Sequence, residues 1–266
     1  MKQGNDSKLN TTVSNDQTPQ VLQYPTKKIN SDDYFAEDTH KYMYCSDGVF
    51  SEFIYSLITK TINVDFKQYT HAIEMGAGMG RFSFALLEHF KQVYLIEPSE
   101  SYVSVLNQLF NKEQVTIINT SMEEFFKSTS IPPKSIFFNF HLLHHLTFEQ
   151  RKIFFTALHA VQTPAVFLEP YPWNPLIILQ LLLYPDMRMK DEWQYLKLTR
   201  KRLSQELNAC GLTVAAYGKL CFLPPPITKI ALKSSFMRKP LFALDCLKQV
   251  APFLSSYHVL YCTSSP

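Results

Sequence analysis

The chain has 266 residues, of which 46% are hydrophobic and 18% are charged, and its net charge is +3. This length suits one large domain that buries a sizeable core without disulfide or metal staples. The small net charge disfavours a nucleic-acid partner, which usually requires a pronounced basic stripe. The five cysteines are odd in number and lack CxxC spacing, so we expect reduced thiols and no zinc site.

Residues 1–30 are polar and lack both a periodic apolar face and the apolar segment of a signal peptide, which predicts a flexible tail. The longest apolar run, residues 176–184, contains Gln180 and is about half of the ~20 residues that a membrane span needs. We therefore expect a cytoplasmic protein without a transmembrane segment. Aromatic and aliphatic side chains within residues 31–68 predict one or two helices with an apolar stripe, which we interpret as a helical cap.

Short apolar runs and helical patterns then alternate along the main domain, predicted over residues 69–266. Strands are predicted at residues 71–75, 92–98, 115–120, 135–140 and 165–170. Helices are predicted between them at residues 81–90, 101–110, 122–126 and 148–161. The strands are continuous apolar runs, as expected when helices cover both faces of a parallel sheet.

The regular alternation of predicted strands and helices ends after residue 170. We expect an apolar insertion at about 174–195, a helix over 198–210 capped by Gly211, and closing strands at 212–220 and 258–263. A second, proline-bearing insertion at about 224–255 separates these two strands. The whole pattern predicts an α/β fold: a doubly wound, mostly parallel seven-stranded sheet with an N-terminal helical cap and an insertion before the last strand.

A cluster of glycines marks the candidate site. The chain has seven glycines, and three fall within positions 76–80, so that Glu74, Gly76, Gly78 and Gly80 form E-x-G-x-G-x-G between a predicted strand and a predicted helix. Glycine allows a sharp turn and lets a ligand approach the backbone without a Cβ in the way. A dinucleotide fingerprint, G-x-G-x-x-G, would need glycine at position 81, where this chain has Arg81.

An acidic residue follows at the end of the second predicted strand. Glu97 lies 17 residues beyond Gly80. A carboxylate at such a strand end can accept hydrogen bonds from both hydroxyls of a ribose. Together the glycine motif and this acid resemble motif I and the following acidic residue of the class I S-adenosylmethionine-dependent methyltransferases. The resemblance covers about residues 69–170.

The resemblance implies a Rossmann-like fold and S-adenosylmethionine as the cofactor. It implies that Ser121 and Met122 hold the adenine from the loop after the third strand, although the aspartate common in that loop is absent before Met122. It also implies that Asn139 lies beneath the methionine part of the cofactor. The segment SIFFNFHLLHHL resembles the fourth strand and its exit in the small-molecule branch of the family.

The histidines at this exit are candidate catalytic residues. His144 or His145 could act as a general base, because an unperturbed imidazole titrates near pH 6.5. The alternative is that a histidine only ties the strand exit by hydrogen bonds. The spacing HLLHH does not match a metal-binding motif, so we expect no metal. Glu169, Tyr171 and Trp173 either line the substrate entrance or have a structural role.

We expect methyl transfer from S-adenosylmethionine to a small or lipid-like acceptor at oxygen or carbon. The methyl group on a sulfonium is already activated, so the protein mainly aligns the reacting atoms and excludes water. A base is needed only if the acceptor enters protonated. The apolar insertions favour an apolar acceptor pocket, although the same residues could instead pack as core or as the face of a homodimer.

Three alternatives remain from the sequence. A non-catalytic methyltransferase-like scaffold would not need the intact glycine motif and Glu97. An NAD-dependent oxidoreductase is disfavoured by Arg81 and by the absence of an evident Tyr-x-x-x-Lys pair. A protein or nucleic-acid methyltransferase is disfavoured because the fourth strand reads NFHL rather than NPPY or DPPY, and because the sequence has no basic groove.

Overall fold

A computed structural model describes residues 48–110, 113–183 and 196–265. The predicted tail, the first part of the predicted cap and residues 184–195 of the first insertion lie outside the described residues. The division into tail, cap and main domain therefore stays a prediction.

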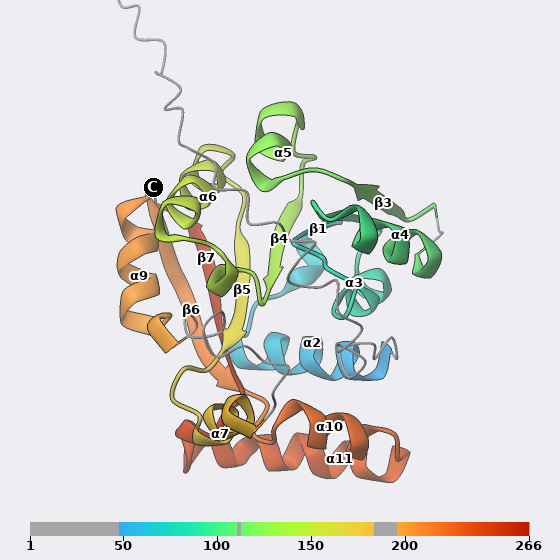
Figure 1. Cartoon of the computed structure of the whole chain (residues 1–266), viewed down its shortest axis with the longest axis vertical. Coiled ribbons are helices and arrows are strands. Elements are labelled where there is room, and N and C mark those ends of the chain that lie inside the picture. Colours follow the sequence, from blue (N-terminus) through green and yellow to red (C-terminus); the bar gives the residue numbers. More distant parts are fainter. Residues whose placement is uncertain (1–47, 111–112, 184–195, 266) are drawn as a thin grey trace, which may run out of the picture.

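One seven-stranded sheet runs through the molecule in the order β3-β2-β1-β4-β5-β7-β6 (Figure 1). The strands are β1 (His71–Met75), β2 (Gln92–Ile96), β3 (Val115–Ile118), β4 (Ser135–Phe140), β5 (Ala165–Pro170), β6 (Leu212–Leu220) and β7 (Tyr257–Ser264). Strands β1 to β5 pair in parallel, whereas β7 is antiparallel to both β5 and β6. The prediction of a doubly wound, mostly parallel sheet is confirmed.

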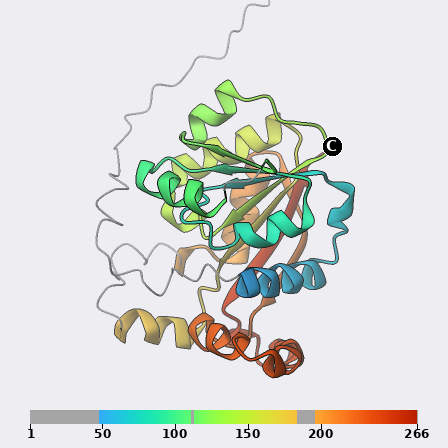
Figure 2. The ribbon, with the colours of Figure 1, turned by 90° about the vertical axis from the view of Figure 1, so that its right-hand side faces the viewer.

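Helices cover both faces of this sheet (Figure 2). They are α2 (Gly48–Ile62), α3 (Ser83–His89), α4 (Glu100–Leu109), α5 (Met122–Ser128), α6 (Phe148–Ala160), α7 (Pro175–Leu183), α9 (Arg200–Ala209), α10 (Pro225–Leu232) and α11 (Ser235–Leu244). Because successive strand residues point to opposite faces, Phe138 of β4 joins the core under α2, α3 and α4, whereas its neighbour Phe137 joins the core under α5, α6 and α9.

Helix α2 lies within the region that the sequence predicted as a cap. Its buried residues Phe50, Ile54, Leu57 and Ile58 recur at helical spacing. They belong to the same hydrophobic core as the sheet residues of β1, β2 and β4. Helix α2 thus packs directly against the sheet and shares its hydrophobic core.

The segment between β6 and β7, where the sequence predicted an insertion, is helical. It comprises α10, α11 and the short 3₁₀ helices η5 (Asp245–Gln249) and η6 (Pro252–Leu254). With α7 it forms the lowest layer in Figures 1 and 2, on the far side of α2 from the sheet. Phe242 of α11 contacts Phe53 of α2 with ring centroids 4.8 Å apart. None of the helices described in residues 48–265 is long and apolar enough to cross a bilayer.

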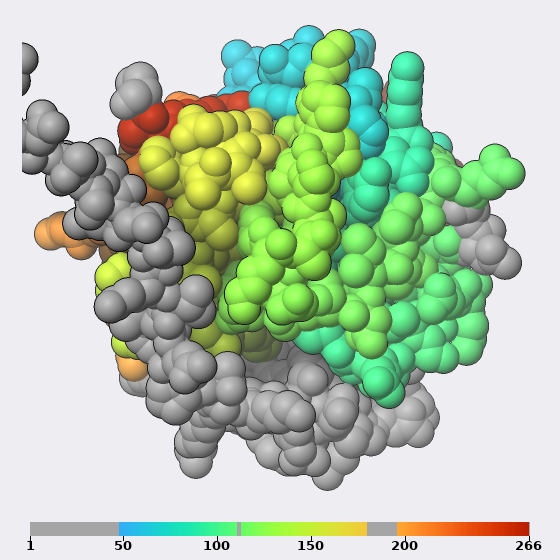
Figure 3. Space-filling view, turned by 90° about the horizontal axis from the view of Figure 1, so that it is seen from above, coloured from blue at the N-terminus to red at the C-terminus, as the bar shows by residue number. Residues whose placement is uncertain are grey.

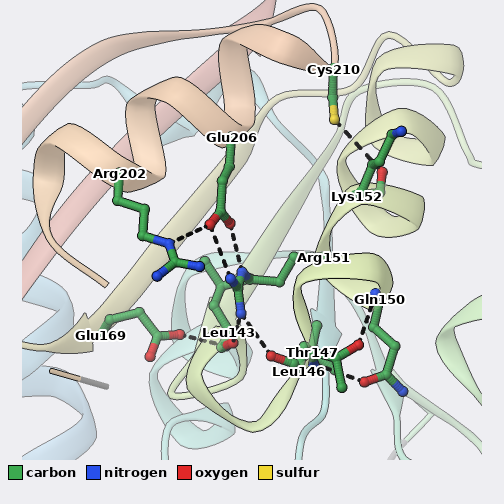
Figure 4. Close-up of polar contacts among 10 residues, drawn as sticks. All are labelled: Leu143, Leu146, Thr147, Gln150, Arg151, Lys152, Glu169, Arg202, Glu206 and Cys210. Carbon is green, nitrogen blue, oxygen red and sulfur yellow. Dashed lines mark hydrogen bonds and ion pairs between the residues drawn. The ribbon is translucent and has the colours of Figure 1, made fainter. Parts of the chain in front are cut away.

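A buried ion pair joins α6 to α9 (Figure 4). Arg151 Nε and Nη2 donate to the Glu206 carboxylate at 2.7 and 3.0 Å, and Arg202 Nε donates to it at 2.8 Å. Arg151 Nη1 also donates to the Leu146 carbonyl at 2.7 Å. Burial alone raises the pKa of Glu206, but the hydrogen bonds and charges of Arg151 and Arg202 outweigh it and lower the pKa below its usual value. The carboxylate is therefore ionised at neutral pH.

We expect Glu206→Gln to lower the free energy of unfolding by about 3 kcal/mol at pH 7, because it leaves the charge of buried Arg151 unpaired. The folded pKa of Glu206 is below the unfolded value, so its contribution is present above about pH 4.5 and is lost as the pH falls through the folded pKa. Urea unfolding at several pH values measures both effects.

A control for this variant is Glu124→Gln. Glu124 lies 3.9 Å from Lys127 in an exposed pair on α5. Its loss should change stability by less than about 0.5 kcal/mol. A Glu206→Gln protein as stable at pH 7 as the wild type would contradict the role of the buried pair.

Candidate functional site

The glycine motif forms the turn between β1 and α3. Gly76, Gly78 and Gly80 have φ angles of 68°, 56° and 78°, all in the left-handed region. A side chain disfavours this region because its Cβ approaches the neighbouring carbonyl oxygen. The three glycines of the motif are thus required by the backbone conformation.

The three glycines differ in what a side chain would meet. A Cβ at Gly76 would lie 2.8 Å from Leu142 Cδ1, and one at Gly80 would collide with the ring of Phe110. A Cβ at Gly78 would meet no atom of the described residues within 4 Å. Gly76 and Gly80 therefore allow close packing inside the protein, whereas Gly78 faces space into which a ligand can approach the backbone.

Glu97 follows β2 and holds this turn from the side. Its Oε2 accepts a hydrogen bond from Gly78 N at 2.8 Å, and its Oε1 accepts one from Ser99 N at 3.0 Å. Burial raises the pKa of Glu97, and the two backbone hydrogen bonds oppose that rise. A carboxylate has about four lone-pair sites, so acceptor capacity remains for further hydroxyl groups.

Glu74 lies on β1 at the base of the turn and is buried. Its Oε2 accepts a hydrogen bond from Ser83 Oγ at 2.6 Å. Burial raises the pKa of Glu74 to about 8, and the negative charge of Glu97 adds to the rise. Glu74 is therefore largely protonated at neutral pH in the absence of a cation nearby.

The loop after β3 lies against the end of β2. Asn119 Nδ2 donates to the carbonyl oxygens of Glu97 and Pro98 at 3.0 and 3.1 Å. Ser121 is the N-cap of α5 and its side chain accepts from Glu124 N, while Met122 is the first residue of that helix. The sequence analysis did not identify Asn119, although an amide after a strand end is an ordinary loop-anchoring signal.

Asn139 is fully buried on β4. Its Nδ2 donates to the Val166 carbonyl at 3.2 Å. Its Oδ1 has no hydrogen-bond partner among the described residues. Buried acceptors are rarely left in this state, so this oxygen has spare capacity for a donor from a ligand or from water.

The two candidate histidines lie in the 3₁₀ helix η3 (Leu143–His145), but in different environments. His144 is buried and its Nδ1 lies 2.6 Å from Glu169 Oε2. Glu169 Oε1 accepts from Leu143 N at 2.7 Å, as seen in Figure 4. The Glu169 carboxylate therefore orients the His144 ring through Nδ1. His145 is exposed, and its ring centroid is 4.0 Å from that of His144.

Tyr171 and Trp173, the other residues predicted near the substrate entrance, lie after β5. Lys219 Nζ donates to the Tyr171 hydroxyl at 2.5 Å and lies 3.9 Å from its ring centroid. Trp173 is exposed. Tyr171 therefore has a partner on β6 within the fold, whereas the indole of Trp173 faces outward.

Two cations next to the glycine turn were not identified from the sequence. The guanidinium of Arg81 lies 5.1 Å from the ring centroid of Phe50, and Lys229 Nζ of α10 lies 5.2 Å from the same ring. Arg81 Nη2 also donates to the Tyr257 hydroxyl at 3.2 Å. The one available signal was Arg81 itself, which occupies the position of the third glycine of a dinucleotide motif.

His141 lies at the exit of β4, with its ring centroid 5.4 Å from that of Phe82. It adopts a left-handed φ of 57°, and its Nε2 has no hydrogen-bond partner among the described residues. Burial, followed by the charge of Arg81, lowers the pKa of His141 well below its ordinary value. The ring is therefore neutral at physiological pH.

These groups gather where the parallel strands end. In Figure 1, β5 leads downward into α7, so the carboxyl ends of β1 to β5 face the layer of α7, α10 and α11. Figure 3 shows the opposite end of the molecule, where the last residues of β7 reach the surface. Open α/β sheets bind ligands at the carboxyl edge of their strands. Within the described residues, no group of three or more His, Cys, Asp or Glu could hold a metal ion.

Comparison with known proteins gives a family match over part of the chain. Residues 72–165 match the family described as "Methyltransferase domain". A search of curated protein sequences finds no match.

Solved structures of methyltransferases share the fold at low sequence identity. The plantazolicin methyltransferase BamL has a TM-score of 0.58 at 14% identity, covering 89% of this chain and 94% of its own. A methyltransferase from Archaeoglobus fulgidus has a TM-score of 0.55 at 14% identity, covering 80% and 94%. The mitomycin 7-O-methyltransferase MmcR has a TM-score of 0.53 at 12% identity, covering 82% of this chain, which spans only 54% of MmcR.

The family match begins on β1 and includes the whole glycine turn, Glu97 and β4. The matched family is one of methyltransferases. It is not a family of NAD-dependent oxidoreductases, which the sequence left as an alternative. The fold, the left-handed glycines and the carboxylate that holds them agree with this match and with S-adenosylmethionine as the cofactor. The chain thus has the Rossmann-like fold of S-adenosylmethionine-dependent methyltransferases, and its residues 72–165 match the methyltransferase domain family.

Proposed function

We propose that this enzyme methylates a small or lipid-like acceptor at oxygen or carbon, using the glycine turn and Glu97 as its cofactor cradle. The observation that carries the proposal is the open Gly78, whose N–H is held by the Glu97 carboxylate at 2.8 Å. A backbone without a side chain at that position suits a ligand that lies directly on it.

The other predicted residues fit the same ligand. Glu97 keeps acceptor capacity for the ribose hydroxyls, and Ser121 and Met122 begin α5 directly after the loop that Asn119 anchors to the end of β2. The Oδ1 of Asn139 is a buried acceptor with spare capacity for the amino acid part of the cofactor. When bound, S-adenosylmethionine supplies a methyl group activated by the positive charge on its sulfur.

An apolar acceptor is supported by the side chains beside the turn. Phe82, which follows Arg81, stacks on Phe140 of β4 with ring centroids 4.8 Å apart, and Phe50 lies next to it at 6.2 Å. Among similar structures, MmcR is named for methylation of mitomycin and ChlM for methylation of magnesium protoporphyrin IX. These names support a small acceptor, and the aromatic surroundings support one with an apolar body.

For an acceptor that enters with its proton, we propose His144 as the general base. Glu169 orients the imidazole through Nδ1, and burial of the pair excludes water that would compete for the proton. His145 has the same chemistry, but its side chain is exposed, so bulk water competes for the proton there.

A screen of labelled methyl transfer over phenols, quinones, fatty acids and amines tests the acceptor class. We expect turnover with at least one apolar member of the set. Methylation confined to protein or RNA would overturn the proposed acceptor. Cofactor binding without turnover on any acceptor would favour the non-catalytic alternative.

The variants Gly78→Ala and Gly78→Val test the cradle. Both should cost about 1–2 kcal/mol of stability because of the left-handed φ. Affinity for S-adenosylmethionine should fall with the size of the side chain, by at least about tenfold for valine. Calorimetric titration and urea unfolding of each variant separate the two effects.

Gly211→Ala is the matched control, since Gly211 has a φ of 80° before β6 and a Cβ there would meet His159. This control should lose stability but keep cofactor affinity. A Gly78→Val enzyme that binds the cofactor as tightly as the wild type would contradict the cradle.

Glu74 predicts a proton release on cofactor binding. In the free enzyme its pKa is about 8, so it is protonated at pH 7. The positive charge of the cofactor favours the ionised carboxylate and lowers this pKa, so a proton leaves at neutral pH and none leaves well above pH 8. Calorimetry in buffers of different ionisation enthalpy measures the release. It should disappear in Glu74→Gln, and equal release in both proteins would exclude Glu74 as its source.

The histidine assignment predicts different effects for neighbouring residues. With a protonated acceptor, His144→Ala should lower kcat by about 100-fold or more, whereas His145→Ala should change it only a few-fold. Glu169→Gln should shift the pH dependence of kcat, because it alters the group that orients His144. Cofactor affinity and melting temperature serve as controls. Equal loss of kcat in the His144 and His145 variants would contradict the assignment.

A further inference from the structure

The outer layer of the insertion between β6 and β7 exposes large apolar side chains. Ile230 of α10, Phe236 of α11 and Val250 after η5 are 70%, 82% and 83% exposed. Ile227, Leu247 and Phe253 of the same segment are also exposed. Folded proteins rarely gather large exposed apolar side chains on one segment without a binding role.

These side chains lie on the outward sides of their helices. On α11, Leu241 is buried against the core, and the exposed positions 236, 239 and 243 recur at the helical spacing that places them opposite it. Leu247 of η5 and Val250 after it are exposed beyond the end of α11. On α10, Leu232 is buried, and Ile227 and Ile230 lie opposite it. We call these exposed residues of α10, α11 and η5, together with Val250, the outer face; α10 and α11 lie in the layer farthest from the sheet in Figures 1 and 2.

The exposed charges of this segment have one sign. Residues 221–256 contain the basic residues Lys229, Lys233, Arg238, Lys239 and Lys248 and a single acidic residue, Asp245. Asp245 is buried and Lys248 Nζ lies 2.6 Å from its Oδ2. The exposed charged side chains of the segment are therefore the cations Lys233, Arg238 and Lys239.

We propose that the outer face binds an anionic membrane surface, with α10 and α11 lying in the plane of the lipid headgroups. Exposed apolar residues flanked by lysine and arginine are the features of helices that insert their apolar side into the headgroup region. A symmetric contact between two copies would instead place the cations of both copies against each other. Anionic lipid complements the charge and also buries Phe236, Ile230 and Val250.

The position of α10 links this surface to the proposed acceptor and therefore rests on the proposed function. Lys229, on the inner side of α10, lies 5.2 Å from the Phe50 ring beside Arg81 and the glycine turn. The outward Ile230 is the next residue. A lipid-like acceptor would then enter from the bilayer toward the carboxyl edge of the sheet, beneath which α10 lies.

Flotation of the full-length protein with vesicles tests the surface. The protein should bind vesicles of phosphatidylcholine containing phosphatidylglycerol at least about tenfold more tightly than vesicles of phosphatidylcholine alone, and less tightly at high salt. The triple variant Ile230→Glu, Phe236→Glu, Val250→Glu should lose this binding. Charge reversal at Lys233, Arg238 and Lys239 should lower it by about 100-fold or more.

Phe148→Glu is the matched control, because Phe148 is an exposed apolar residue on α6, away from the outer face. It should bind vesicles like the wild type. Unchanged cofactor affinity in every variant shows that the fold is intact. Vesicle binding without methyl transfer to any lipid would support the membrane surface but overturn the lipid-like acceptor.

Two results would overturn the membrane surface. One is the absence of wild-type binding to anionic vesicles at low salt. The other is a wild-type dimer, measured by light scattering, that the triple glutamate variant dissociates while neither protein binds vesicles; the face would then belong to a second copy of the chain.

Discussion

The hydrogen bond from Gly78 N to the Glu97 carboxylate is the contact on which the candidate site depends. It joins the turn after β1 to the end of β2 at 2.8 Å and sets the conformation of the backbone that faces the ligand. The turn is held from its other side by α2, where Ser51 Oγ donates to Phe82 O at 2.7 Å and accepts from Ala85 N at 2.9 Å. Since α3 lacks a capping side chain of its own, α2 supplies one, and the cradle depends on a helix from outside the strand–helix repeat.

The central strands and the glycine turn could be predicted because their signals are local. Strands β1, β2, β4 and β5 are buried from both sides and so appear as continuous apolar runs in the sequence. Gly76, Gly78 and Gly80 are needed at adjacent positions by one left-handed turn. The roles assigned to Ser121, Met122 and Asn139 came from resemblance, and they stay predictions.

The remaining features depend on contacts between distant residues, which periodicity does not encode. Arg151 and Glu206 pair across 55 positions, and His144 meets Glu169 across 25. The proximity of Arg81, Phe50 and Lys229 requires three separate elements to converge on one ring. An apolar helical stripe also has the same pattern whether it faces the core or the outside, so the outer face of α11 could be recognised only once Leu241 was seen to be buried.

The place of β7 in the sheet has a consequence for how the chain reaches its folded state. Among the strands of the described residues, β6 pairs only with β7, and β7 inserts between β5 and β6, with Ala165 paired to Cys262. During synthesis β6 emerges before β7. It stays unpaired until more than thirty further residues have left the ribosome. Pairings of such long sequence separation form slowly, and an unpaired edge can associate with other chains in the meantime. Nascent chains thus expose both edges of β6 until β7 pairs with one of them.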